Sequence, residues 1–392
     1  MSDTSQTPER IVILGGGLAA ASAAQTLREE GYDGAITLVG AEPELPYERP
    51  QLSKEFLKSD ADFEVIHDRA WYDDQRVELR SGRRANGLDL APAGSVRLDD
   101  GTVLSFDRLL LATGAEPRAL ALDGGGSAYT LRTIADARAL KERLGEGTRV
   151  ALIGGGWIGL EVAAAARSHG ARPTVLEQAE LPLQHVLGTE LAGYLRDLHL
   201  ANGVDLRTGV NVLGLADGVV STDAGPVEAD LVVAAVGAVP AVALAEAAGL
   251  RVSDGIEVDR QLRTSDPRVF AAGDVALADH PVLGRLRVEH WDNALRQGSL
   301  AARTMLGGAQ SYDWAPYFYT DQFTFSMEYV GHSAPDDEVL IRGDLSAGEF
   351  IAYWLRDGVL TAGMNVNIWD VNDTLREMLG TSPDPDSLTD LR

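Results

Sequence analysis

The sequence predicts an α/β protein made of two similar parallel-sheet units and a smaller α+β part at its C-terminus. Three observations predict it. A pattern of strand, glycine turn and helix begins at residue 10, the same pattern recurs at residue 149, and the segment after about residue 315 has short alternating strands between Gly/Asp turns. A chain of 392 residues is too long for one ordinary core, so we expect two or three domains.

The first pattern has the residues of a dinucleotide-binding fingerprint. A β-branched apolar run, Arg10–Leu14, leads through three glycines into an Ala-rich helix over Leu18–Glu29. Gly15 permits the tight turn, Gly17 lets the backbone approach a pyrophosphate, and Ala20 allows the helix to pack closely on the strand. The helix N-terminus then offers unpaired N–H groups and a positive dipole to the phosphates.

The residues after this helix complete the fingerprint. A second strand over 35–39 is followed by Glu42, which can accept hydrogen bonds from ribose hydroxyls. A glycine-rich turn that binds nothing is the alternative interpretation of a single fingerprint. Here the strand, the helix and the acid all fall where the fingerprint needs them, so the first unit is predicted to bind a dinucleotide.

The fingerprint recurs about 139 residues later. Strand Arg149–Ile153 leads into a helix that reaches about residue 169, and a strand over 173–176 ends at Glu177. The small residues of this second turn are Gly154, Gly156 and Gly159. Because a carboxylate at residue 177 pairs with the adenosine ribose 2′-hydroxyl and repels a 2′-phosphate, NADH is predicted over NADPH. Two fingerprints in one chain indicate two dinucleotides, most simply a flavin and a nicotinamide coenzyme.

Composition and charge exclude several function classes. A formal net charge of −25 opposes binding to nucleic acid or to an anionic membrane, because phosphate contacts need clustered cations. With no cysteine, disulfides, thiolate zinc sites, all-Cys iron–sulfur clusters and dithiol catalysis are excluded. The seven histidines show no metal-ligand spacing, so no protein-bound metal is expected. The chain has neither a membrane-length apolar run nor a secretory signal, so a cytoplasmic protein is expected.

Further motifs resemble those of the putidaredoxin reductase-like, NADH-dependent ferredoxin reductases, in the flavoprotein superfamily related to glutathione reductase. PYERPQLSK matches the family's PYxRPPLSK loop, with Gln51 in place of the second proline. LLLATGAEPR, TSDPRVFAAGD and VEHWDNALRQG match segments around the FAD, and VGAVPAVALAEAAGL matches the turn near the nicotinamide, with Ala241 where asparagine is usual. PYFYTDQF corresponds to PWFWSDQ, with Tyr319 replacing the second tryptophan.

The resemblance implies roles for individual residues. Lys54, one of only three lysines, corresponds to the lysine beside the reactive flavin N5, and Glu161 to its acidic partner. Since a buried ammonium is costly unless paired, we expect an ion pair that positions the nicotinamide and stabilises the reduced flavin. Lys54 and Glu161 are therefore the catalytic candidates, whereas Lys58 is interpreted as solvated surface. The expected FAD contacts are Gly15, Gly17, Leu18, Ala19, Ala20, Glu42, Arg49, Lys54, Ala85, Thr113, Gly114, Arg132, Asp274 and Trp291. The expected NAD contacts are Gly154, Gly156, Ile158, Gly159, Glu161, Glu177 and Gly237.

The order of the motifs implies two Rossmann-like dinucleotide-binding domains, for FAD and NAD, plus a small α+β C-terminal domain. The FAD-binding domain is expected to be discontinuous, over residues 1–117 and 243–314. The NADH-binding domain is expected at 118–242, inserted between these two parts, and the C-terminal domain at 315–392.

The resemblance implies an FAD-dependent NADH:ferredoxin oxidoreductase whose partner is a [2Fe–2S] ferredoxin coupled to an oxygenase. A rubredoxin reductase, or a reductase of quinones or small radicals, would share the same motifs. An NADH-sensing flavoprotein of the apoptosis-inducing-factor type is the alternative from another class, and the charge of −25 opposes it. The sequence is compatible with a monomer or a homodimer, and with either packing or electron transfer at Tyr319. The basic run RVELRSGRR is interpreted as a solvated hairpin, the alternative being a docking patch.

Overall fold

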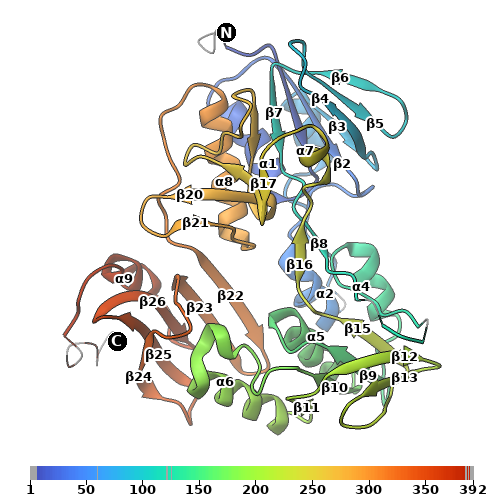
Figure 1. Cartoon of the computed structure of the whole chain (residues 1–392), viewed down its shortest axis with the longest axis vertical. Helices are drawn as coiled ribbons and strands as arrows, with labels where there is room; N and C mark the ends of the chain where they lie inside the picture. Colours follow the sequence, from blue (N-terminus) through green and yellow to red (C-terminus); the bar gives the residue numbers. More distant parts are fainter. Residues whose placement is uncertain are drawn as a thin grey trace. The chain divides into compact units, whose positions relative to one another are not determined.

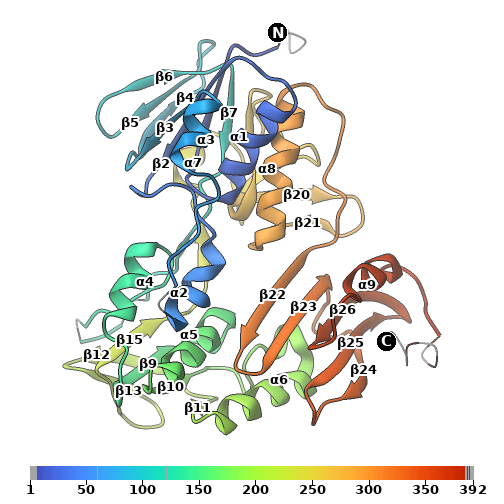
Figure 2. The same ribbon diagram turned by 180° about the vertical axis from the view of Figure 1, so that it is seen from behind.

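The structure, a computed structural model, describes residues 7–59, 61–120, 122–124, 126–384, 386 and 388. The chain divides into two compact units, whose elements are labelled in Figures 1 and 2. The first unit comprises Met1–Arg49, Phe63–Glu116 and Ala238–Pro316, and the second comprises Pro50–Asp62, Pro117–Gly237 and Tyr317–Arg392. The three-domain division is finer than these two units and stays a prediction.

The first unit is built on a five-stranded sheet in the order β19-β7-β1-β2-β3, with every neighbouring pair parallel. Its strands are β1 (Arg10–Leu14), β2 (Ala35–Gly40), β3 (Val77–Ser81), β7 (Arg108–Leu111) and β19 (Val269–Ala271). The side chains of Ile11, Val12 and Ile13 are all buried. Such unbroken apolar runs are typical of parallel strands that are covered on both faces.

Two long helices of the first unit, α1 (Leu18–Glu29) and α8 (Trp291–Met305), lie side by side in both views (Figures 1 and 2). Their backbones approach closely at Gly298, where an added Cβ atom would lie 2.3 Å from the carbonyl oxygen of Ala19. Only glycine fits at this crossing without moving one of the helices. The packing therefore ties the segment around residue 291 to the first glycine turn.

The rest of the first unit is antiparallel or short. Strands β5 and β6 form a hairpin that belongs to the antiparallel sheet β4-β5-β6. The remaining elements are β4 (Ala85–Asp89), β5 (Ser95–Leu98), β6 (Val103–Ser105), β16 (Ala238–Pro240), β17 (Val252–Ser253), β18 (Gly255–Val258), β20 (Ala276–His280), β21 (Gly284–Leu286), α3 (Arg69–Asp74), α7 (Ala243–Ala247) and the 3-10 turn η2 (Gly273–Val275). The chain passes from the first unit to the second within the 3-10 turn η1 (Arg49–Leu52) and within β8 (Ala115–Pro117).

The second unit repeats the strand–helix–strand arrangement in a four-stranded parallel sheet of order β11-β10-β9-β15. Its elements are β9 (Arg149–Ile153), β10 (Arg172–Leu176), β11 (Asp205–Arg207), β12 (Val212–Ala216), β13 (Val219–Thr222), β14 (Val227–Glu228), β15 (Leu231–Ala234), α2 (Glu55–Lys58), α4 (Ile134–Lys141), α5 (Trp157–Ser168) and α6 (Gln184–Ala201). Helix α6 was not among the predicted elements. It contains a kink at Gly188, which has φ 77° and ψ 173°.

The C-terminal part of the second unit is a five-stranded sheet in the order β22-β23-β26-β25-β24, with antiparallel neighbours. Its elements are β22 (Tyr317–Gln322), β23 (Phe325–Gly331), β24 (Glu338–Asp344), β25 (Glu349–Arg356), β26 (Val359–Val366) and α9 (Asn372–Met378). Leu187, Leu191 and Leu195 of α6 pack into the core of this sheet. The predicted fold class, two parallel-sheet units and an α+β C-terminal part, is confirmed.

Among the described residues, no helix is both long enough and apolar enough to cross a bilayer. Within the same residues, no group of three or more His, Cys, Asp or Glu side chains is arranged to hold a metal ion.

Candidate functional site

The first glycine turn leaves an open helix N-terminus. Gly15 has φ 143°, and an added Cβ atom would lie 2.0 Å from the carbonyl oxygen of Ala112, so only glycine fits there. Gly17 caps α1 without a side-chain hydrogen bond, and a Cβ atom on it would meet nothing within 4 Å. Helices α3 and α4, by contrast, are capped by the side chains of Asp68 and Thr133. The first-turn N–H groups of α1 and the open space at its N-terminus fit a pyrophosphate.

An acid, an arginine and a tyrosine that follow the first fingerprint in the chain are in contact with one another. Glu42 accepts hydrogen bonds from Arg49 at 2.9 Å and from the Tyr47 hydroxyl at 2.7 Å. The guanidinium of Arg49 also lies 5.0 Å from the centre of the Tyr47 ring. Burial lowers the pKa of Arg49, but the fields of Tyr47, Glu42 and Asp274 outweigh it and raise that pKa. Three predicted FAD residues, Glu42, Arg49 and Asp274, thus belong to one electrostatic cluster.

The predicted Thr-Gly turn is held by the backbone of Ala241. The Thr113 hydroxyl donates to the carbonyl oxygen of Ala241 at 2.9 Å. The N–H of Ala241 donates in return to the carbonyl oxygen of Gly114, also at 2.9 Å. Both hydrogen bonds use the backbone of residue 241, so they do not require the asparagine side chain that the family motif contains.

Trp291 is the first residue of α8, and its indole N–H donates to the carboxylate of Glu48. Burial raises the pKa of Glu48, the hydrogen bond from Trp291 lowers it, and the field of Glu64 raises it further, with a net increase. Sequence reasoning missed Glu48, which occupies the variable position of the PYxRPPLSK motif. The remaining FAD candidates of the first unit are Leu18, Ala19 and Ala20 in α1 and Ala85 in β4. Lys54 and Arg132 belong to the second unit.

The second glycine turn has the same construction as the first. Gly154 has φ 104°, and a Cβ atom on it would lie 2.4 Å from the carbonyl oxygen of Ala235. A Cβ atom on Gly159 would lie 2.1 Å from the carbonyl oxygen of Gly154, so helix α5 can pack at this distance only on glycine. Gly156 caps α5 without a side-chain hydrogen bond and has open space around its Cα atom.

The acid of the second fingerprint is fixed against this turn. Glu177 accepts hydrogen bonds from the N–H of Gly155 at 2.6 Å and from the N–H of Ala179 at 2.8 Å. Ile158 is exposed in the first turn of α5, and Gly237 has φ 91° just after β15. All seven predicted NAD contacts therefore lie in the second unit, and they fit a second dinucleotide.

The predicted ion pair between Lys54 and Glu161 is present. The Lys54 Nζ atom lies 2.8 Å from Glu161 Oε1, and the two residues are 6% and 2% exposed. Glu161 also accepts hydrogen bonds from the hydroxyls of Ser53 and of Thr320, the latter at 2.5 Å. Lys54 Nζ lies 5.4 Å from the centre of the Tyr319 ring. A buried charge pair needs additional hydrogen-bond donors. This requirement could have directed the search for partners of Glu161 to nearby hydroxyl side chains such as those of Ser53 and Thr320.

The expectation that Lys58 is only solvated surface is wrong. Its Nζ atom donates to the carbonyl oxygen of Asp321 at 2.9 Å, and the residue is half-buried. The cause is the position of α2, which packs against α4 and α5 and so brings its last residue to the end of β22.

The basic run at 76–84 is matched by acids. Three of its arginines pair with carboxylates at 2.6–3.5 Å, namely Arg80 with Glu78, Arg83 with Asp100 and Arg84 with Glu116. The interpretation as a hairpin is wrong, because residues 77–81 form β3, the edge strand that pairs in parallel with β2. The pairing of the arginines with acids gives no support to the alternative of a docking patch. Exposed pairs of this kind contribute about 1 kcal/mol or less to stability.

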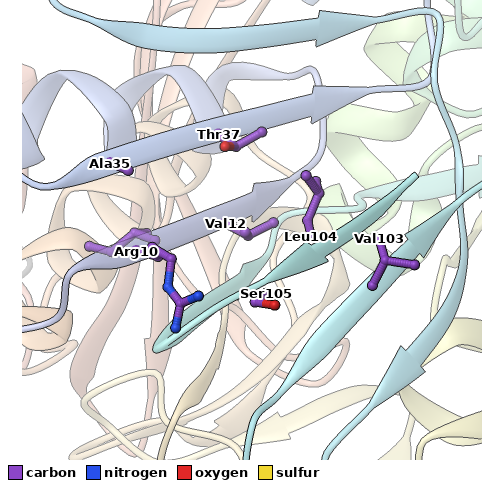
Figure 3. Close-up of a pocket in the computed structure, with 8 residues that line it drawn as sticks. Arg10, Val12, Ala35, Thr37, Val103, Leu104 and Ser105 are labelled. Atoms are coloured by element: carbon purple, nitrogen blue, oxygen red, sulfur yellow. The ribbon is translucent and has the colours of Figure 1, made fainter.

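A pocket of about 260 Å³ lies between the β4-β5-β6 hairpin and strands β1 and β2, as Figure 3 shows. This volume is below the roughly 300–1,000 Å³ of typical small-molecule sites. Arg10, which lines it, is paired with Asp107 at 3.1 Å. The pocket contains none of the predicted site residues, so we regard it as a surface groove and place the function at the two glycine turns and the buried ion pair.

Two dinucleotide sites and a buried charge pair define an oxidoreductase that uses a flavin and a nicotinamide coenzyme. Residues 9–298 match the family model described as pyridine nucleotide-disulphide oxidoreductase, and residues 317–392 match the model described as reductase C-terminal. The chain belongs to the pyridine nucleotide-disulphide oxidoreductase family. Because it contains no cysteine, the disulphide chemistry in the family's description does not apply to it.

The chain is also similar to individual ferredoxin reductases. It is 41% identical to the ferredoxin–NAD(+) reductase component of the anthranilate 1,2-dioxygenase system of Burkholderia cepacia, over 97% of this chain and 96% of that one. It is 35% identical to putidaredoxin reductase of Pseudomonas putida, over 92% and 89% of the two chains. The reductase in the crystal structure of the covalent putidaredoxin reductase–putidaredoxin complex superimposes with a TM-score of 0.93 at 32% identity, over 98% and 96%. The resemblance inferred from the sequence is confirmed, and FAD and NAD(H) are the cofactors.

Proposed function

We propose that this protein is an FAD-dependent NADH:ferredoxin oxidoreductase that passes single electrons to a [2Fe–2S] ferredoxin, which in turn feeds an oxygenase of Rieske or P450 type. The observation that carries the proposal is the buried pair Lys54–Glu161 in a chain without cysteine. Lys54 provides a positive charge for a reaction at a flavin, and the chain has no cysteine thiol that could relay electrons. The names of the similar reductases support the ferredoxin and the oxygenase as partners.

The chemistry divides between cofactors and side chains. When bound, FAD supplies the redox step, because it accepts a hydride from NADH and gives up the two electrons one at a time. Lys54 places a positive charge where negative charge develops, and Glu161 fixes the direction of the ammonium group through the ion pair. Burial of both side chains excludes water, which strengthens their field.

The other predicted residues bind and orient. The N-termini of α1 and α5 hold the two pyrophosphates, with Glu42 and Glu177 at the riboses. The FAD-binding domain comprises residues 1–117 and 243–314, the NADH-binding domain 118–242, and the C-terminal domain 315–392. We place the protein in the cytoplasm, where NADH is available, as a monomer or a homodimer.

Cytochrome c reduction tests the proposed acceptor. We expect steady NADH-dependent reduction of cytochrome c only when a [2Fe–2S] ferredoxin is added. Equal rates with rubredoxin or a quinone and no response to ferredoxin would favour the alternative reductases. Slow turnover with a long-lived charge-transfer band in the absorption spectrum would favour an NADH-sensing flavoprotein instead.

A matched pair of glycine variants tests which turn binds which cofactor. Gly17 and Gly156 both have negative φ and open space around the Cα atom, so alanine leaves the fold intact. We expect Gly17→Ala to weaken FAD binding at least about tenfold, the effect of roughly 1.4 kcal/mol, because the methyl group occupies the space that a pyrophosphate approaches. Gly156→Ala should weaken NADH binding by a similar factor and leave FAD affinity unchanged. Titration calorimetry of the two variants measures both constants, and a reversed pattern would exchange the two assignments.

A further inference from the structure

A chain of buried hydrogen bonds runs from helix α6 to the acid of the ion pair. His199 of α6 contacts Gln322 of β22, with 2.8 Å between Nε2 and Oε1. Gln322 Nε2 donates to the Thr320 hydroxyl at 3.2 Å, and that hydroxyl donates to Glu161 Oε1 at 2.5 Å. His199, Gln322 and Thr320 are 0%, 0% and 1% exposed. The resemblance assigned a role to none of these three side chains.

The charge of Glu161 fixes the direction of every bond in this chain. A carboxylate paired with Lys54 at 2.8 Å has no proton to give, so the Thr320 hydroxyl must donate to it. That hydroxyl then has no proton for Gln322, so the amide group of Gln322 must donate to Thr320. The amide oxygen of Gln322 consequently faces His199, which must donate through Nε2.

The surroundings of His199 agree with this single arrangement. Within the described part of the chain its Nδ1 atom has no hydrogen-bond partner, as expected for the bare nitrogen of an imidazole protonated at Nε2. Burial lowers the pKa of His199, and the hydrogen bond that His199 donates to Gln322 only partly offsets this decrease. The ring edge packs against Phe323, whose ring centre is 5.1 Å away. A buried, neutral imidazole therefore ends the chain.

We propose that Thr320, Gln322 and His199 are positioning residues that hold the Glu161 carboxylate in the orientation that pairs with Lys54. The Ser53 hydroxyl donates to the other carboxylate oxygen, so both oxygens of Glu161 are hydrogen-bonded. This inference rests on the proposed role of Lys54 and Glu161 in the reduction of FAD by NADH. It gives β22, the first strand of the segment that matches the reductase C-terminal model, a part in that half-reaction.

The first arm of the test removes one hydroxyl. Thr320→Val keeps the shape of the side chain but withdraws a hydrogen bond from a charged group, so we expect NADH to reduce the bound FAD roughly 10- to 100-fold more slowly in stopped-flow experiments. Thr320→Ser, which keeps the hydroxyl, should recover most of the rate. Thr304→Val is the matched control, since Thr304 is also buried and, among the described residues, its hydroxyl donates to carbonyl oxygens of its own helix. Wild-type rates for Thr320→Val would overturn the inference.

The second arm does not depend on turnover. In ¹⁵N–¹H spectra of the protein without FAD, the His199 signals, identified by their loss in His199→Asn, should show a protonated Nε2 and a bare Nδ1. Thr320→Val frees the Gln322 amide to reverse, so we expect the other tautomer to appear in it and not in Thr320→Ser. A wild-type His199 protonated at Nδ1 would refute the chain even if NADH reduces FAD normally. A normal tautomer together with full activity of Lys54→Met would instead refute the proposed role of the ion pair.

Discussion

Lys54→Met is expected to lower the free energy of unfolding by about 3–5 kcal/mol, the cost of leaving a buried charge without its partner. Glu161 is 2% exposed, so in this variant its carboxylate keeps two hydroxyl donors but loses the cation that pairs with it. Lys58→Met is the matched control four residues away, because Lys58 is half-buried and donates to a backbone carbonyl group. We expect it to cost about 1 kcal/mol, the value of an ordinary hydrogen bond. Urea unfolding, followed by circular dichroism, measures both.

The double variant Lys54→Met/Glu161→Gln separates stability from function. A neutral amide removes the unpaired charge and can still accept a hydrogen bond from Thr320, so most of the lost stability should return. Reduction of FAD by NADH should nevertheless stay roughly 100-fold slower than in the wild type, because the positive charge that we propose to act on the flavin is gone. If stopped-flow rates recovered together with stability, the ion pair would be structural only.

Glu177→Ala is expected to reduce the preference for NADH over NADPH roughly 10- to 100-fold, the range for a hydrogen bond to a charged group. The carboxylate is held by the N–H groups of Gly155 and Ala179, beside the turn where we propose that the adenosine ribose binds. Removing it eliminates an acceptor for the 2′-hydroxyl and the repulsion of a 2′-phosphate. Values of kcat/KM for both coenzymes with ferricyanide as acceptor measure the change without involving ferredoxin.

Two further variants sharpen this experiment. Glu177→Gln retains an acceptor oxygen without the charge, so it should lose the repulsion of NADPH but keep part of the affinity for NADH. Glu180→Ala removes an exposed acid three residues away and should leave the preference unchanged. Unaltered discrimination in Glu177→Ala would show that another feature of the turn selects the coenzyme.

The features that sequence predicted best are local. Each glycine turn with its flanking strand and helix is encoded in about 30 consecutive residues. Its pattern can therefore be recognised in the sequence without knowledge of any tertiary contact. Helix α6 was missed although Leu187, Leu191 and Leu195 recur every fourth residue, which is a helical signal. It lies outside both fingerprints, and only the structure shows that these leucines complete the core of the C-terminal sheet.

The support of the ion pair could not be predicted in the same way. Lys54 and Glu161 came from a resemblance, since 107 residues separate them. The motif PYFYTDQF indicates a strand but not its neighbour, and the hydrogen bond between Thr320 and Glu161 exists only because β22 packs against α5. Gln322 and His199 depend on a further element, α6. Hydrogen bonds between side chains so distant in the chain have no periodic signature.

The placement of the lysines has a practical consequence for trapping the complex with an electron acceptor. Of the three primary amines on lysine side chains, Lys54 is buried and Lys58 and Lys141 are half-buried. Amine-reactive crosslinkers and amine-coupled sensor surfaces will consequently find few lysine side chains to react with. Its 59 Asp and Glu side chains are the better targets for crosslinking. Carbodiimide activation of these carboxylates should join the protein to lysines of the acceptor.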